Sequence, residues 1–248
     1  MEHESTFTNT DWDVYAHCYD TLTQLRPYAE MIDEVASLVP RDAKSVLDLG
    51  CGTGTLLARI DSFTKAELTG LDNSPQMLAI AAKKLSHSAA TLRQCNLEDV
   101  SNWGGSYDCV VSTNVLYTMN NPLLFLLHIR QTVNVGGTVI IVTPKIGYDN
   151  GLILKEHCGD TRPDSFWCDP HRSPTRERRL IKEALGQSQL AKDMQTIAAH
   201  NRRIAGTGTF HFLTEEELRT LASSAGLQLV DIHTTYAEQN FLIVLTRE

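Results

Sequence analysis

The residues with the clearest chemical role are an aspartate and three glycines in the stretch VLDLGCGTG at positions 46–54. Its first four residues are typical of a short buried strand, and Gly50, Gly52 and Gly54 follow at alternate positions. Glycine adopts positive φ readily and lets a ligand lie against bare backbone. In an open α/β sheet, such a turn lies at the carboxyl end of the first strand, where nucleotides bind. The stretch therefore predicts a nucleotide-binding turn.

Asp48 and the glycine spacing indicate which kind of nucleotide the turn binds. A dinucleotide site uses G-x-G-x-x-G, which seats a pyrophosphate on the amino terminus of a helix. Here Thr55 occupies the place of the last glycine in that pattern. The Asp48 carboxylate would repel a pyrophosphate and attract an ammonium group. The turn therefore favours a nucleoside ligand that carries positive charge and no phosphate.

The pattern that begins at Asp48 resembles D-x-G-x-G-x-G, the first motif of class I S-adenosylmethionine-dependent methyltransferases. The resemblance implies that the chain binds S-adenosyl-L-methionine and releases S-adenosyl-L-homocysteine. A second acid, Asp72, follows the expected second strand, 24 residues after Asp48. A carboxylate at that place accepts hydrogen bonds from both ribose hydroxyls. The alternative for Asp72 is a helix-capping acid.

The same resemblance implies further contacts with the cofactor. Asn96 stands where the family usually has an aspartate that accepts from the adenine amino group, and an amide oxygen can also accept. Tyr19 matches the tyrosine of W-D-x-x-A-x-x-Y-D, which closes over the cofactor in many small-molecule members; the alternative is an aromatic residue that anchors its segment to the core. The full set predicted to bind the cofactor is Tyr19, Asp48, Gly50, Cys51, Gly52, Gly54, Asp72, Asn73, Met77, Asn96, Leu97 and Asn114.

The segment after the expected fourth strand, STNVLY at 112–117, indicates the class of acceptor. It lacks the [DN]-P-P-[YF] motif of enzymes that methylate amines of nucleic acid bases. It also lacks the acids that hold a divalent cation in catechol-type methyltransferases. Both absences favour a metal-free enzyme that acts on a small molecule.

Tyr117 and His211 are the candidate catalytic residues. The working face of this fold lies at the carboxyl ends of the parallel strands. Tyr117 leaves the fourth strand there, and His211 precedes the last helix at the same face, as does the hairpin at 236–240. A histidine can act as a base or orient an acceptor. The alternative for His211 is a hydrogen-bonded structural residue.

Apolar periodicity predicts the elements that position these residues. Strands are expected at 45–49, 66–71, 91–94, 107–112, 138–143, 229–235 and 241–245, and helices at 27–39, 53–61, 74–85, 121–133 and 214–225. Alternating strands and helices imply a mostly parallel sheet with helices on both faces. The last two strands form a hairpin that gives the sheet an antiparallel edge. We expect one Rossmann-like α/β domain with a seven-stranded sheet over residues 1–248.

Two segments lie outside this alternation. Residues 1–40 are expected to form a helical segment that covers the site as a lid. Residues 145–209 are too many for a structureless loop in a compact domain, and apolar residues recur there at helical spacing. We expect a helical insertion that binds the acceptor or acts as a lid, with a structural or dimerising role as the alternative. Candidates to bind an anionic acceptor are Arg176, Arg178, Arg179, Arg202 and Arg203, unless they form a solvated helix face.

Composition excludes several classes of protein. The 248 residues are 42% hydrophobic, as in a globular domain, and the net charge of −8 makes a nucleic-acid partner unlikely on electrostatic grounds. No signal peptide or membrane span is expected, because the first ten residues are polar and no apolar run is long enough. Six cysteines occur singly, which is typical of a cytoplasmic protein. No metal site is expected, since the spacing of His157, Cys158, Cys168 and His171 matches no zinc pattern.

The sequence thus predicts a cytoplasmic enzyme that transfers a methyl group from S-adenosyl-L-methionine to nitrogen or oxygen of a small-molecule acceptor. Direct in-line transfer needs an aligned acceptor and a dry site. One alternative is a non-catalytic scaffold or activator that binds the cofactor. Another is an NAD-type oxidoreductase, which Thr55 and Asp48 disfavour. The oligomeric state stays open, with a homodimer through residues 145–209 as one arrangement.

Overall fold

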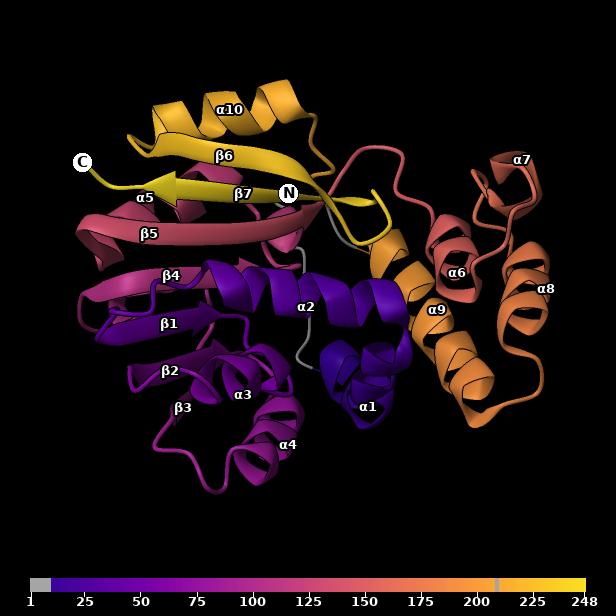
Figure 1. Cartoon of the computed structure of the whole chain (residues 1–248), viewed down its shortest axis with the longest axis horizontal. Helices are drawn as coiled ribbons and strands as arrows, with labels where there is room; N and C mark the ends of the chain where they lie inside the picture. Colours follow the sequence, from indigo (N-terminus) through magenta and orange to yellow (C-terminus); the bar gives the residue numbers. More distant parts are fainter. Residues whose placement is uncertain (1–9, 208–209) are drawn as a thin grey trace, which may run out of the picture.

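A computed structural model describes residues 10–207 and 210–248, in which seven strands form one sheet in the order β3-β2-β1-β4-β5-β7-β6 (Figure 1). The strands are β1 (Ser45–Leu49), β2 (Glu67–Asp72), β3 (Thr91–Gln94), β4 (Tyr107–Thr113), β5 (Val133–Pro144), β6 (Gln228–Thr235) and β7 (Asn240–Thr246). Strands β1 to β5 pair in parallel, and β7 is antiparallel to both β5 and β6. The predicted Rossmann-like sheet with an antiparallel edge hairpin is confirmed.

Two element boundaries differ from the prediction by two residues or more, each for a local reason. Strand β5 begins at Val133 rather than at 138, because Val133 already pairs with Tyr107. The register then shifts before Thr138, and the extra chain turns at Gly136 with φ +78°. Helix α3 (Thr55–Asp61) begins two residues later than predicted, because Gly54 is left-handed at φ +75°.

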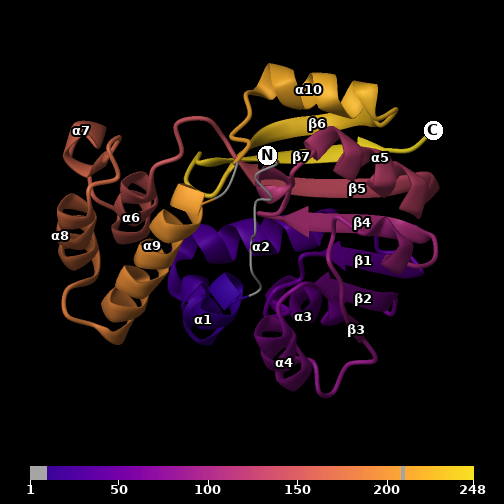
Figure 2. The same ribbon diagram turned by 180° about the vertical axis from the view of Figure 1, so that it is seen from behind.

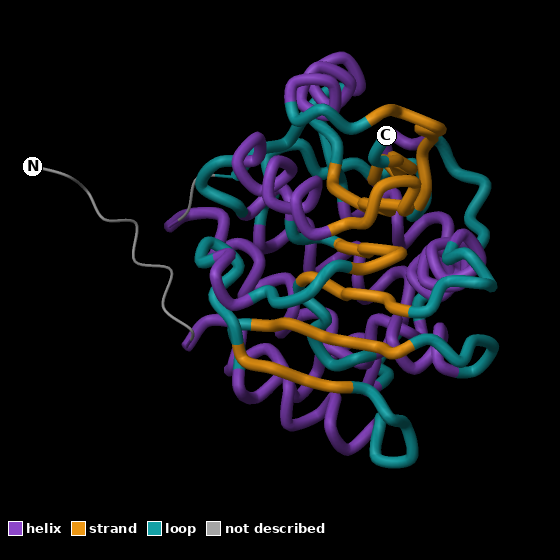
Figure 3. The backbone as a smooth tube through the Cα atoms, turned by 90° about the vertical axis from the view of Figure 1, so that its left-hand side faces the viewer, coloured by secondary structure: helices purple, strands orange, loops and turns teal. Residues whose placement is uncertain are grey.

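Helices cover both faces of the sheet (Figures 2 and 3). One face packs against α2 (Arg26–Leu38), α3 and α4 (Pro75–Lys84), and the other against α5 (Pro122–Thr132) and α10 (Glu215–Ser224). Adjacent residues of β1 supply both cores: Val46 lies in one and Leu47 in the other, because strand side chains alternate between faces. A capping box between Thr214 and Glu217 begins α10.

Within residues 145–209, the part that the structure describes, 145–207, contains four helices beyond the carboxyl ends of the parallel strands (Figure 1). They are α6 (Asn150–Cys158), α7 (Asp164–Trp167), α8 (Pro174–Leu185) and α9 (Gln189–Thr207). Their apolar faces join the core that contains α2, through residues such as Trp167, Leu180 and Ile197. Helix α9 also packs against α1 (Thr10–Tyr19). The segment therefore forms a helical cap over the end of the sheet where ligands bind in this fold.

The amino-terminal segment is hydrogen-bonded to the elements that flank the glycine turn. Asp13 of α1 accepts a hydrogen bond from the Ser74 hydroxyl at 2.5 Å, at the start of α4. Asp20, the first residue of the 3₁₀ helix η1 (Asp20–Gln24), accepts from Thr53 at 2.6 Å and pairs with Lys84 at 2.7 Å. These contacts hold α1 over one end of the sheet. Among the described residues, no helix has both the length and the apolar character needed to cross a membrane.

Candidate active site

The turn after β1 is the glycine-rich segment expected from the sequence. Gly50, Gly52 and Gly54 have φ values of +79°, +52° and +75°. A Cβ atom on Gly50 would lie 2.2 Å from Cγ2 of Val115, so a side chain at this position would force Val115 to move. The amides of Gly50 and Cys51 donate to the Leu71 carbonyl at 2.8 and 3.0 Å, which holds the turn against the end of β2.

Two carboxylates flank this turn. Asp72 accepts from the amide of Gly52 at 2.8 Å and from the amide of Ser74 at 2.9 Å. Asp48 is 1% exposed, and its Oδ1 atom has no hydrogen-bond partner. Burial, together with the nearby charge of Asp72, raises the pKa of Asp48 to about 8. An unpaired buried carboxyl oxygen is costly unless a ligand donates to it, so this side chain fits the ammonium group of S-adenosylmethionine.

Of the other residues predicted to bind the cofactor, Tyr19 lies beside the turn, and several others are exposed or buried in the two cores. Tyr19 is close to the turn, because its Cε1 lies 4.0 Å from the place that a Cβ on Gly52 would take. Asn96 is exposed, and its side-chain oxygen accepts from the amide of Glu98 at 3.1 Å. The side chains of Cys51, Met77 and Leu97 are buried in the two cores, and Asn73 accepts from Gln94 through its carbonyl. The structure thus brings Tyr19, Asp48, Asp72 and the glycines together.

Asn114 lies where β4 ends, and its backbone is left-handed at φ +58°. Its amide donates to the Val142 carbonyl at 2.8 Å. Its side-chain oxygen accepts from the fully buried Asn240 at 2.7 Å, which links the end of β4 to the final hairpin. The hairpin therefore reaches the working face, as predicted.

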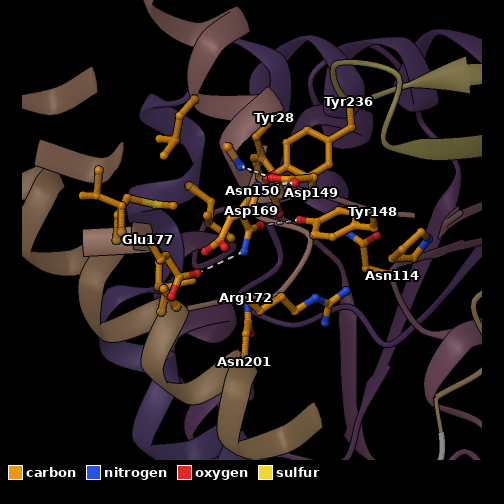
Figure 4. Close-up of a pocket in the computed structure, with 18 of the residues that line it drawn as sticks. Tyr28, Asn114, Tyr148, Asp149, Asn150, Asp169, Arg172, Glu177, Asn201 and Tyr236 are labelled. Atoms are coloured by element: carbon orange, nitrogen blue, oxygen red, sulfur yellow. Dashed lines mark hydrogen bonds between the residues drawn. The ribbon is translucent and has the colours of Figure 1, made fainter. Parts of the chain in front are cut away.

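A cavity of about 150 Å³ lies between this face and the helical cap (Figure 4). Its lining is rich in aromatic side chains, and six of them are tyrosines: Tyr15, Tyr19, Tyr28, Tyr117, Tyr148 and Tyr236. Burial raises the pKa of every one of these hydroxyls, so all six are neutral at physiological pH. The ring of Phe210 stacks on Tyr117 with centroids 5.3 Å apart.

The helical cap supplies most of the polar, non-tyrosine side chains of the cavity wall. Its side chains are Asp149, Asn150, Asp169, Arg172, Glu177 and Asn201 (Figure 4). The sequence analysis did not single out any of them. The only local signal was an acid and an amide that follow one another shortly after the fifth strand, and that signal does not say where α8 and α9 fold back.

The structure does not place His211 in the cavity wall. Phe210 and Phe212 line the cavity on either side of it in the chain, and His211 does not. The His211 amide donates to the Tyr117 carbonyl at 2.9 Å, and its ring Nε2 is buried without a hydrogen-bond partner. Tyr117, the other candidate, does line the cavity. The positions therefore favour Tyr117 as the residue that contacts the acceptor.

Four of the arginines singled out in the insertion, Arg176, Arg178, Arg179 and Arg202, do not line the cavity. Arg176 donates to the backbone carbonyls of Ser165, Phe166 and Cys168, which end the short helix α7. Arg202 pairs with Glu177. Arg178 and Arg179 are exposed, and the side chain of Arg203 lies outside the described residues. The arginine in the cavity wall is Arg172, whose guanidinium lies 5.4 Å from the centroid of Phe212.

No set of three metal-ligating side chains comes together in the part of the chain that the structure describes. His157, one of the four residues considered for zinc, accepts a hydrogen bond from the Arg26 amide through Nδ1 at 3.1 Å.

Comparison with known proteins places this geometry in a family. The family described as "Methyltransferase domain" matches residues 22–232. Malonyl-[acyl-carrier protein] O-methyltransferase of Halalkalibacterium halodurans is 30% identical over 189 residues, which are 71% of this chain and 64% of that protein. Trans-aconitate 2-methyltransferase of Streptomyces avermitilis is 36% identical over 109 residues, 42% of this chain and 40% of that protein. The chain thus spans less than two thirds of these relatives.

A solved structure shares the fold. Magnesium protoporphyrin IX methyltransferase from Synechocystis PCC 6803, with bound SAH, superposes with a TM-score of 0.58 at 15% identity, over 91% of this chain and 86% of that one. The fold is that of a class I S-adenosylmethionine-dependent methyltransferase. The match over residues 22–232 shows that the chain belongs to the methyltransferase domain family. The family and fold class expected from the sequence are confirmed.

Proposed function

We propose that the chain transfers a methyl group from S-adenosyl-L-methionine to a nitrogen or oxygen atom of a small molecule. The observation that carries this proposal is the cavity that extends from Tyr19, beside the glycine turn, to Glu177 in the helical cap. A cavity of about 150 Å³ is comparable to one that holds a single aromatic ring, which supports a small acceptor. The name of one relative, trans-aconitate 2-methyltransferase, also supports a small acceptor.

The cofactor side of the site uses charge and bare backbone. We assign the Asp48 carboxylate to the ammonium group and the Asp72 carboxylate to the ribose hydroxyls. The three glycines let the ligand approach the backbone. When bound, S-adenosylmethionine supplies an electrophilic methyl group: the acceptor forms a bond to its carbon as the carbon–sulfur bond breaks, and the acceptor proton passes to water or a base.

The acceptor side uses aromatic walls and neutral hydroxyls. The tyrosines exclude water, which strengthens electrostatic interactions inside the cavity. The Tyr117 hydroxyl stays protonated because burial raises its pKa, so it can donate to the acceptor and hold it in line with the methyl group. The amide of Asn114 borders the same space. We propose a cytoplasmic location, which the six free cysteines support.

Titration calorimetry of the purified chain tests the proposal, with S-adenosylhomocysteine as ligand and NAD as comparison. We expect micromolar binding, ~8 kcal/mol, for S-adenosylhomocysteine and none for NAD. Absence of S-adenosylhomocysteine binding contradicts the proposal. A screen of small acceptors with labelled methyl donor then follows. Binding without any methyl transfer in that screen favours the scaffold or activator alternative.

A further inference from the structure

The half of the cavity that lies within residues 145–209 contains three acids. Asp149, Asp169 and Glu177 belong to its wall, together with two asparagine amides (Figure 4). Acids that are paired inside the protein are structural, whereas an acid without a partner is available to a ligand. The hydrogen bonds of each carboxylate therefore decide which of the three can bind one.

Two of the three acids already have partners. Asp149 accepts from the amide of Gly151 at 2.8 Å through Oδ1 and from the amide of Asp169 at 2.6 Å through Oδ2. Glu177 forms an ion pair with Arg202, and the Asn150 amide lies 3.4 Å from its other oxygen. Both carboxylates hold parts of the helical cap together.

Asp169 differs from its neighbours. It is 8% exposed, and its Oδ2 atom is buried without a hydrogen-bond partner. No basic side chain of the described residues forms an ion pair with it. Arg172 is three residues away and donates its amide to the Asp169 carbonyl, but its guanidinium lies over Phe212. A buried carboxylate without a partner is costly, so its retention in a cavity wall points to a ligand that donates to it.

We propose that Asp169 binds a primary or secondary ammonium group of the methyl acceptor, an inference that rests on the proposed function. An ammonium group supplies both the missing hydrogen-bond donor and the opposite charge. The aromatic side chains of the same cavity attract a cation through their faces. Asp149 is a positioning residue, because its bond to the Asp169 amide fixes the turn that carries the carboxylate. The acceptor class is therefore a small amine with an aromatic or apolar body.

Three phenols with related para side chains and different charge test this proposal. Tyramine carries an ammonium group, 4-ethylphenol carries none, and 3-(4-hydroxyphenyl)propionate carries a carboxylate. Each is titrated by calorimetry near neutral pH into the full chain saturated with S-adenosylhomocysteine. We expect tyramine to bind at least about tenfold more tightly than 4-ethylphenol, since a hydrogen bond to a charged group contributes about that factor or more. The propionate should bind most weakly.

The near-isosteric substitution Asp169→Asn supplies the second half of the test. It should reduce the affinity for tyramine to that for 4-ethylphenol and leave the affinity for S-adenosylhomocysteine unchanged, which also shows that the variant is folded. Asp42→Asn, at an exposed acid outside the cavity, is the matched control and should alter neither affinity.

Several results would overturn the assignment. The assignment is wrong if the wild-type chain does not bind tyramine, or binds it no more tightly than 4-ethylphenol. It is also wrong if Asp169→Asn keeps the full preference for tyramine. An equal loss of S-adenosylhomocysteine affinity would assign Asp169 to the cofactor instead. If the wild-type chain does not bind S-adenosylhomocysteine, the proposed function fails separately, and the tyramine comparison without that ligand still decides the role of Asp169.

Discussion

The carboxylate of Asp72 accepts a hydrogen bond from the amide of Gly52 at 2.8 Å. The last residue of β2 is thereby tied to the middle of the turn that follows β1. The same carboxylate accepts from Ser74, the residue that caps α4. One side chain therefore shapes the turn and borders the space where we place the ribose.

Replacement of Asp72 tests this double role. We expect Asp72→Ala to weaken S-adenosylhomocysteine binding about 10- to 100-fold, because it removes charge-assisted hydrogen bonds to the ligand. Asp72→Asn keeps one acceptor oxygen and should lose less. Calorimetric titration of both variants measures the effect. Unchanged affinity in Asp72→Ala would contradict the assignment to the ribose.

Asp48 should make the ligand-free chain less stable as pH rises. Its pKa in the folded chain is about 8, against an unfolded value of about 3.9, so the folded state binds the extra proton between these values. The contribution of protonated Asp48 to the free energy of unfolding is therefore complete below about pH 4 and is lost as pH rises through 8. We expect Asp48→Asn to be more stable than wild type at pH 9 by on the order of 1–3 kcal/mol, and to bind S-adenosylhomocysteine more weakly. Urea unfolding at several pH values measures the first effect, and a stability gap that does not depend on pH would contradict it.

Two equally left-handed glycines, one in the turn after β1 and one in β5, allow a comparison. Gly50 and Gly136 have φ of +79° and +78°, so alanine at either costs about 1–2 kcal/mol in backbone strain. Only Gly50 has a neighbour within reach, since its Cβ would meet Val115 at 2.2 Å, whereas nothing lies within 4 Å at Gly136. We expect Gly50→Ala to cost a further ~1–3 kcal/mol in urea unfolding. Equal losses of unfolding free energy in the two variants would show that Val115 moves aside without an energetic cost.

Substitution of Tyr117 should lower turnover much more than substitution of His211. Tyr117→Phe removes a hydroxyl from the cavity wall. We expect kcat/KM on an identified acceptor to fall about tenfold, because one orienting hydrogen bond is lost. His211 lies outside that wall, so His211→Ala should stay within about twofold of wild type, although the sequence made it a candidate base or acceptor-orienting residue. Affinity for S-adenosylhomocysteine serves as the control for folding. A larger loss in His211→Ala than in Tyr117→Phe would restore the catalytic role of His211.

A histidine outside the active site, His233, should contribute to stability in a pH-dependent way. His233 of β6 contacts Glu34 of α2 and Asp231 of its own strand, each at 2.8 Å, and its bond to Glu34 is the main cause that raises its pKa. The stabilisation is thus complete below the unfolded pKa of about 6.5 and is lost as pH rises through the higher folded value. Because the side chain is 39% exposed, we expect His233→Gln to cost only about 0.2–1 kcal/mol at pH 6 and nothing at pH 9. A loss that is the same at both pH values would contradict the ion pair.

Much of the fold could be predicted from local patterns. The seven strands appear where apolar runs and turn residues placed them, and β1 and β3 match residue for residue. The start of β5 was missed because the pairing of Val133 with Tyr107 depends on a partner strand and not on the composition of 133–137. The helical character of 145–209 was visible as periodicity, whereas its position over the sheet was not.

The glycines, Asp48 and Asp72 were identifiable from sequence alone, because the chemistry of a turn between a strand and a helix depends on near neighbours in the chain. The acceptor cavity was decided by tertiary structure. Its tyrosines come from α1, α2, the segments that follow β4 and β5, and the final hairpin, and its acids come from the helical cap. Side chains so far apart in the chain meet only because the cap packs across the carboxyl ends of the strands. That packing also places Phe210 and Phe212, but not His211, in the cavity wall.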